Sequence, residues 1–152
     1  MRFDVALVIV MSCLLCLGCH EKTKPSTTGD EAKVPATSPS QLLDTKWELT
    51  EVYGKPVIPA ETDRAAFIQF SSQDQRAVGM ATINRFFGQF TLEGDKLKLD
   101  PLGMTRMAGP EPLMKQEDAF VKALSATKSY RIAGNTLELL DGDMVIAKFA
   151  KR

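Results

Sequence analysis

Short runs of alternating apolar and polar residues, divided by turn residues, constrain the fold of this chain more than any other feature. The clearest example is QFTLEGDKLKL, residues 89–99, in which Gly94-Asp95 separates two alternating segments. Successive side chains of a strand point to opposite faces, so each segment buries one face only. Glycine at the first position of a two-residue turn is typical of a type II′ β-hairpin. We therefore expect residues 89–93 and 96–99 to form an antiparallel hairpin.

The same pattern recurs between Trp47 and Phe149 and predicts a mainly β fold. Turns such as Gly54-Lys55, Gly134-Asn135 and Asp141-Gly142-Asp143 divide the segments, and residues 76–83 are expected to form one more strand. The side chains expected to face the core are Trp47, Leu49, Ala66, Ile68, Phe70, Phe90, Leu92, Leu97, Leu99, Tyr130, Ile132, Leu137, Leu139, Val145, Ala147 and Phe149. Short antiparallel strands at this close spacing are typical of a sandwich or a barrel.

One helix interrupts the strands, and we expect it near residues 111–127. Pro110-Glu111-Pro112 supplies its start, because proline fits the first helical turn and an acidic side chain there interacts favourably with the helix dipole. The expected buried face carries Leu113, Phe120, Val121 and Leu124, which recur at helical spacing. The expected fold class is therefore α+β, a mainly β domain with one packed helix.

Glu117 falls on the apolar side of this helix, between Leu113 and Phe120. A carboxylate in that position is costly unless it is hydrogen-bonded or paired. Its leading candidate partners in the rest of the domain are Asn84, Arg85, Thr105 and Arg106. We predict that Glu117 reaches across to this set and fixes the helix against the sheet.

The N-terminal region predicts export and attachment to a membrane. Residues 5–18, VALVIVMSCLLCLG, form an apolar run that is too short to span a bilayer comfortably as a helix. We expect residues 1–18 to be a secretory signal peptide. Leu17-Gly18-Cys19 is similar to the lipobox of bacterial lipoproteins, which implies that Cys19 carries fatty-acyl chains such as palmitate at the mature N-terminus. An ordinary cleaved signal and an uncleaved anchor are the alternatives.

Residues 19–40 predict a disordered tether between the lipidated N-terminus and the folded domain. Residues 20–40 contain three prolines, many serines and threonines, and Val34 as the only large aliphatic residue. Such a segment cannot bury enough apolar surface to offset the entropy of the chain. We therefore place the folded domain at residues 41–152.

Composition argues against several classes of function. The chain carries 19 basic and 19 acidic residues, which gives no electrostatic case for binding nucleic acid. All three cysteines precede residue 20 and the single histidine is His20, so the domain cannot hold a disulfide or a metal site built from His and Cys. It has no cysteine nucleophile and no Ser–His pair, and we expect neither enzymatic activity nor a cofactor. Carboxylate chemistry by Glu111, Glu117 or Asp118 is the enzymatic alternative that this inventory leaves open.

The domain resembles the META-domain family, of the heat-shock protein J (HslJ) type found in bacterial envelope lipoproteins. The resemblance rests on Thr45-Lys46-Trp47, on Asn84-Arg85-Phe86 with Gly88, and on Met104-Thr105-Arg106-Met107. It implies a strongly curved, barrel-like antiparallel sheet with one packed helix. It also implies a protein of the cell envelope that is associated with heat shock and novobiocin resistance, without established catalytic chemistry.

Two further implications come from such resemblances. Many family members have cysteines at the positions held here by Ile83 and Gly109, and the joint loss of both is expected if the pair normally forms a disulfide. His20 rather than aspartate follows Cys19. By similarity to lipoprotein sorting rules, this implies anchoring in the outer membrane, with the domain facing the periplasm.

Three functions stay open at this point. The first is a lipid-anchored envelope protein that supports stress tolerance by binding another envelope component, with Arg85 and Arg106 as exposed contacts. A purely structural role for the two arginines is its alternative. The second is a small carrier of an apolar ligand, which would require a barrel cavity of several hundred Å3 lined by the phenylalanines and methionines; a filled core explains the same residues. The third is an inhibitor of a cell-wall hydrolase.

Overall fold

The structure is a computed structural model that describes residues 38–59 and 65–152. The predicted signal peptide at 1–18, the predicted lipidation of Cys19 and most of the predicted tether lie outside the described residues. The helices and strands, in chain order, are α1 (Pro39–Leu42), β1 (Lys46–Val52), β2 (Lys55–Pro56), β3 (Phe67–Phe70), β4 (Arg76–Met80), β5 (Arg85–Glu93), β6 (Lys96–Leu99), β7 (Gly103–Met104), α2 (Glu111–Ala126), β8 (Ser129–Ala133), β9 (Thr136–Asp141) and β10 (Met144–Lys151).

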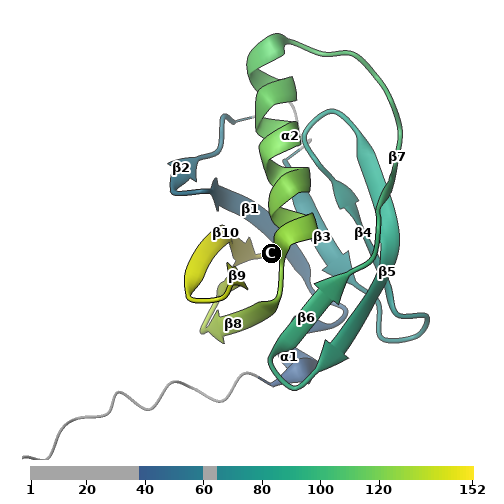
Figure 1. Cartoon of the computed structure of the whole chain (residues 1–152), viewed down its shortest axis with the longest axis vertical. Helices are drawn as coiled ribbons and strands as arrows, with labels where there is room; N and C mark the ends of the chain where they lie inside the picture. The colour runs from purple at the N-terminus through teal and green to yellow at the C-terminus, as the bar shows by residue number, and fades with distance from the viewer. Residues whose placement is uncertain (1–37, 60–64) are drawn as a thin grey trace, which may run out of the picture. The chain divides into compact units, whose positions relative to one another are not determined.

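Eight antiparallel strands form a closed barrel (Figure 1). Their order is β10-β9-β8-β6-β5-β4-β3-β1, and β10 pairs with β1 to close the sheet. The two remaining strands lie outside this ring, β2 beside β1 and β7 beside β5. The predicted mainly β fold, a strongly curved sheet with one packed helix, is confirmed.

The predicted hairpin has the expected register and turn. Glu93 of β5 pairs with Lys96 of β6, which leaves Gly94 and Asp95 as the two turn residues. Gly94 has a φ of 63°, which glycine adopts without the steric cost that a Cβ brings. This geometry at the first turn position agrees with the type II′ hairpin expected from the sequence.

Aromatic side chains fill the interior of the barrel. Trp47 is buried, and its Nε1 donates to the Leu42 carbonyl at 3.1 Å, so the indole ties β1 to α1. The Phe70 and Phe90 rings meet edge to face, with centroids 5.2 Å apart. The largest fully buried side chains are Trp47, Tyr130, Phe70, Phe86, Phe120, Phe149, Leu42, Ile68, Leu97, Leu124, Leu137 and Leu139. The stability of the domain therefore comes mainly from packing of large apolar groups.

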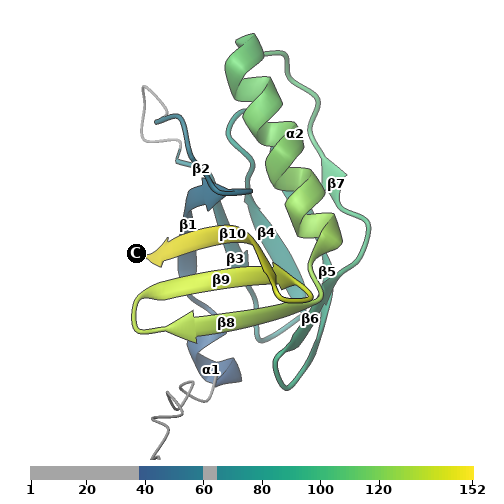
Figure 2. The same cartoon turned by 60° about the vertical axis from the view of Figure 1, so that its left-hand side comes forward.

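Helix α2 packs against the barrel through contacts with β1, β6, β9 and β10. Figures 1 and 2 show it lying between the β8–β10 strands and the β3–β5 strands, with the segment after β7 climbing to its N-terminus. The helix begins where Pro110 and Pro112 allow it, and ends at Thr127, whose hydroxyl donates to the Ala123 carbonyl at 3.0 Å. Within the described residues, no helix is both long enough and apolar enough to span a membrane.

Several details differ from the sequence prediction. A bulge in β10 between Val145 and Ala147 shifts the alternation by one residue, so Ile146 is buried in place of Val145. A bulge adds a residue to one strand and turns the following side chains to the other face. The strand expected at 76–83 ends at Met80, because residues 81–84 turn the chain into β5.

The other differences concern the helices and the shortest strands. On α2, Gln116 and Glu117 are buried, whereas Leu113 and Val121 are only half-buried. Helix α1 begins at Pro39, inside the last residues of the predicted tether. The two-residue strands β2 and β7 were not predicted, since segments this short carry no alternation of their own.

Candidate functional site

A buried polar cluster joins α2 to the turn between β4 and β5. Glu117 is 3% exposed, and its Oε2 accepts hydrogen bonds from the backbone N–H groups of Ile83 at 3.0 Å and Asn84 at 2.8 Å. Its Oε1 accepts from Nδ2 of Asn84 at 2.6 Å. Each carboxylate oxygen thus has a donor, which is the condition for holding such a group inside a protein.

Asn84 extends the cluster to the segment after β7. Its Oδ1 accepts from Thr105 Oγ1 at 2.9 Å and from the Met107 N–H at 2.7 Å. Its Nδ2, already bonded to Glu117, donates also to the Met107 carbonyl at 3.1 Å. The 2% exposed asparagine therefore connects three segments: the turn at 81–84, the extended residues 105–107 and helix α2.

Gln116 makes a second connection from the same helix. Its Oε1 accepts from the Ile58 N–H at 2.5 Å, and its Nε2 donates to Thr82 Oγ1 at 3.1 Å. Thr82 has a φ of 129°, an unusual value for a residue other than glycine. Sequence reasoning missed Gln116 and Thr82. The sequence offered one indication of Gln116: it is a polar residue next to Glu117, at the edge of the apolar face of the helix.

The predicted partners of Glu117 divide into two groups. Asn84 contacts the carboxylate directly, and Thr105 contacts it through Asn84. The Arg85 backbone N–H donates to Thr105 Oγ1 at 3.1 Å, but the Arg85 side chain is exposed. Arg106 is exposed as well, and neither guanidinium forms an ion pair with any residue that the structure describes. The contact of either arginine side chain with Glu117 is therefore absent from the described structure.

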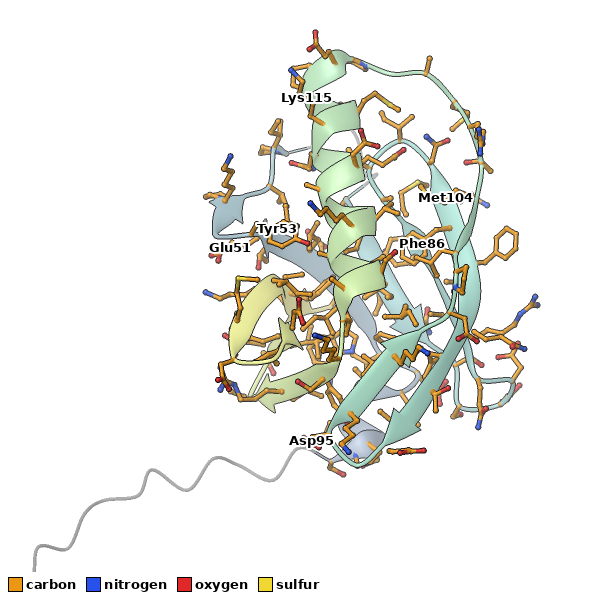
Figure 3. The ribbon with its side chains drawn as sticks, in the orientation of Figure 1. Glu51, Tyr53, Phe86, Asp95, Met104 and Lys115 are labelled. Carbon is orange, nitrogen blue, oxygen red and sulfur yellow. The ribbon has the colours of Figure 1, made fainter. Side chains whose placement is uncertain are left out.

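Exposed apolar and basic side chains surround the same segments on the outside of the barrel. We call this set the β5–β7 surface: Arg76, Val78, Arg85, Phe87, Arg106 and Met107. Phe87 is 51% exposed, Met107 50% and Val78 41%. Val78 pairs with Phe87 across β4 and β5, so their side chains are neighbours on the outer face. Phe86 instead points toward α2 (Figure 3), where its ring meets that of Phe120 edge to face.

The ring of Phe87 leans toward β7. Phe87 pairs with Gly103, and a Cβ built on Gly103 would lie 2.8 Å from two ring carbons of Phe87. A side chain at position 103 would therefore displace the ring. The absence of a side chain at Gly103 lets the exposed phenyl group lie over the backbone of β7.

The charge of the β5–β7 surface is of one sign. Residues 76–92 and 101–110 contain Arg76, Arg85 and Arg106 and no aspartate or glutamate. Among the residues that the structure describes, none of these three arginines forms an ion pair. The surface can therefore accept carboxylate or phosphate groups without displacing an internal ion pair.

Two hollows lie elsewhere on the domain. One, of about 620 Å3, lies beside the end of α2 and is lined from β5, β6 and residues 125–128. The other, of about 350 Å3, lies between the β1–β2 hairpin and the first half of α2. Metal ligands do not gather in either place, since residues 38–59 and 65–152 bring no three His, Cys, Asp or Glu side chains together.

A closed antiparallel barrel, one packed helix and a buried carboxylate–asparagine link define a small β-barrel domain. Residues 40–152 match the META domain family, and the chain belongs to that family. Its fold is similar to that of a protein from Burkholderia xenovorans solved by NMR, with 24% identity, a TM-score of 0.63, and coverage of 74% of this chain and 85% of that one. A second NMR structure is also 24% identical, with a TM-score of 0.59 and coverage of 75% and 94%. No curated protein matches the sequence.

Proposed function

We propose that this protein is a non-enzymatic, lipid-anchored component of the bacterial envelope that binds another envelope component through the β5–β7 surface. Acyl chains on Cys19 anchor it, in the outer membrane with the domain facing the periplasm. Its role is in stress tolerance, as in the HslJ type of the family. The observation that carries the proposal is the exposed Val78–Phe87 pair, accompanied by arginines on segments that contain no acidic residue.

The composition of this surface is that of a binding site rather than of a solvated face. Aromatic and arginine side chains dominate the binding energy of protein interfaces, whereas most solvated faces mix charges of both signs. A half-exposed phenylalanine beside an exposed valine gives an apolar centre. Arg85 lies on the same outer face of β5, two residues from Phe87, and supplies a planar donor for a carboxylate or phosphate.

The arrangement of the carboxylates supports a non-enzymatic role. Both oxygens of Glu117 accept hydrogen bonds inside the domain, so this buried group has no open side for a substrate. Glu111 is at the helix start, exposed, and paired with Lys115 at 2.6 Å. A general acid or base must reach a substrate proton, and neither of these two groups lines either of the two hollows described above.

The second candidate, a carrier of an apolar ligand, has one supporting observation. The hollow of about 620 Å3 beside the end of α2 has a volume suited to a small molecule. Its lining residues come mostly from β5, β6 and the helix end, and none of them is a phenylalanine or methionine of the kind that the carrier hypothesis requires. The buried phenylalanine rings pack against each other in the interior. An inhibitor of a cell-wall hydrolase is a special case of the partner-binding function, and the same experiment tests it.

Crosslinking in intact envelopes tests the proposed function. A photoreactive residue replaces Met107 in the full chain, and captured components are compared with those from an Arg85→Ala, Arg106→Ala version. Loss of two charged contacts predicts a decrease in capture of roughly tenfold or more, since each contributes about 1 kcal/mol or more. The control is Arg131→Ala, because Arg131 is ion-paired to Glu138 on β9 and lies outside the surface. Equal capture by the double variant and the control would refute the assignment of this surface.

A further inference from the structure

One edge of strand β7, beside the β5–β7 surface, has no strand partner among the described residues. The strand pairs with β5 on its other side. In Figures 1 and 2 it lies at the margin of the domain. The opposite extra strand, β2, contains Pro56, which lacks the N–H that a further strand would need. Proline is one of the means by which proteins protect sheet edges, and β7 has none.

The hydrogen-bond register identifies the groups at this edge. The Thr105 N–H donates to the Arg85 carbonyl at 3.0 Å, so Thr105 is turned toward β5. In an antiparallel ladder, neighbouring residues direct their backbone groups to opposite sides. The N–H and C=O groups of Met104 and Arg106 therefore point away from β5, and within the described residues no strand lies there to receive them.

We propose that the β7 edge binds an extended, acidic segment of a partner protein as an added β-strand. This inference rests on the proposed function and specifies its partner. Added strands gain affinity from backbone hydrogen bonds and specificity from the side chains beside them. Here Met104 and Arg106 supply the backbone groups, and the β5–β7 surface supplies the side-chain contacts.

The side-chain environment favours an occupant with alternating apolar and acidic residues. Gly103 presents no side chain, and the Phe87 ring lies over it, so an apolar residue of the added strand can reach the ring across the glycine. Arg85 flanks the same face, and Arg106 belongs to the edge itself. Residues 76–92 and 101–110 hold no acidic side chain, so the charges that these segments offer to carboxylates on the added strand are positive.

The test uses the purified full chain in detergent micelles and a fluorescent ten-residue peptide of alternating valine and glutamate. A matched peptide has lysine in place of glutamate. We expect the acidic peptide to bind at least about tenfold more tightly, because two charged contacts are at stake. Arg106→Ala removes the guanidinium and should weaken binding of the acidic peptide by roughly fivefold relative to the natural chain. Arg106→Pro also removes the outward N–H and should bind the peptide about fivefold more weakly than Arg106→Ala does. Arg131→Ala is the control and binds like the natural chain.

A second measurement does not depend on a proline variant that still folds. Binding of the acidic peptide should slow amide exchange at Met104 and Arg106 at least tenfold and leave Thr105 unchanged, since only the first two amides face the edge. Equal binding of both peptides, no saturable binding, or unchanged exchange at Met104 and Arg106 would each overturn the proposal. So would a dimer of the chain that Arg106→Pro dissociates, because the occupant would then be a second copy.

The two proposals fail differently. Capture in intact envelopes can depend on Arg85 and Arg106 and yet be the same for Arg106→Pro as for Arg106→Ala. In that case the binding surface is correct and the added strand is wrong. If the peptide binds at the edge but the double arginine variant captures every component normally, the edge is a strand acceptor and the assigned envelope function is wrong.

Discussion

The buried Asn84–Glu117 cluster and the exposed β5–β7 surface use neighbouring residues of the chain but differ in solvent exposure and in hydrogen bonding. Asn84 is 2% exposed, whereas Arg85, which follows it, is exposed. Thr105 and Arg106 are both exposed, but the Thr105 hydroxyl bonds to Asn84. In the cluster every polar atom of Asn84 and Glu117 side chains has a partner within the domain. On the surface, the guanidinium groups have no ion-pair partner among the described residues.

This contrast separates two roles within one sequence motif. A buried polar network rigidifies a fold only when it is fully satisfied, and the cluster meets that condition. It holds residues 105–107 against the β4–β5 turn, and thereby fixes the strand whose outer edge and neighbouring side chains remain free. Asn84, Thr105 and Glu117 therefore join segments of the domain, whereas Arg85 and Arg106 are exposed beside them, where the proposed function would use them.

The largest effect is expected from Glu117→Ala. The substitution leaves two backbone N–H groups and one of the two Nδ2 hydrogens of Asn84 without an acceptor, at a cost of roughly 3 kcal/mol or more in the free energy of unfolding. Urea denaturation of the full chain measures it. Glu111→Ala on the same helix is the matched control, because Glu111 is exposed and its pair with Lys115 contributes less than about 0.5 kcal/mol. Similar losses in both variants would show that the cluster does not stabilise the helix on the barrel.

A disulfide at positions 83 and 109 should strengthen the same region. A Cβ built on Gly109 would lie 2.8 Å from Cγ1 of Ile83 and 3.5 Å from Cγ2, and in a disulfide the sulfur of one residue lies about 3 Å from Cβ of the other. The Ile83→Cys, Gly109→Cys variant should therefore oxidise without rearrangement of the backbone. Closing this loop is worth about 3 kcal/mol. The melting temperature of the oxidised form is compared with that of the reduced form, and an unchanged value would contradict the proximity of the two positions.

The contact between positions 83 and 109 is one part of the structure that the sequence allowed us to predict. The resemblance to relatives with cysteines at both positions implied that Ile83 and Gly109 are neighbours, and the structure brings them into contact. The alternating segments predicted most of the barrel, because a strand with one buried face must alternate. They failed at Val145, where a bulge changes the period, and at β7, which is too short to have a period.

The candidate site was only partly predictable, for a different reason. The helical position of Glu117 showed that its carboxylate needs a partner. The sequence alone could not decide which of the four candidate residues named above would supply it. Chain geometry decided in favour of Asn84, whose backbone and side chain both donate to Glu117. The exposure of Phe87 was also not predicted, because the adjacent Phe86 and Phe87 are both candidates for the core. Their exposure in the structure shows which of the two faces inward: Phe86 is 1% exposed and Phe87 is 51% exposed.

A smaller effect on stability, with a large one on binding, is expected from Phe87→Ala. Half of the ring is already in contact with water, so the variant should lose less than about 1 kcal/mol of unfolding free energy. Capture from the Met107 photoreactive position should nevertheless decrease at least as much as with Arg85→Ala. The comparison is with Phe86→Ala, which removes a buried ring and should cost about 3–5 kcal/mol. A Phe87→Ala protein that loses stability like Phe86→Ala would place this ring in the core and remove it from the surface.

The smallest effect concerns the ion pair between Glu48 of β1 and Arg152, which lies outside the β5–β7 surface. The hydrogen bond from Arg152 holds the pKa of Glu48 below its ordinary value of 4.5. A carboxyl group whose pKa is lower in the folded state contributes stability above its unfolded pKa, and loses that contribution as pH falls through the folded pKa. Because Arg152 is largely exposed, the contribution is at most about 0.5 kcal/mol. Glu48→Gln should therefore be slightly less stable than the natural chain at pH 7 and equally stable below the folded pKa. Asp44, whose pKa is lowered by hydrogen bonds from Ser72, is common to both proteins and cancels in their difference. A difference that persists at the lowest pH would show that packing, and not charge, links β1 to the C-terminus.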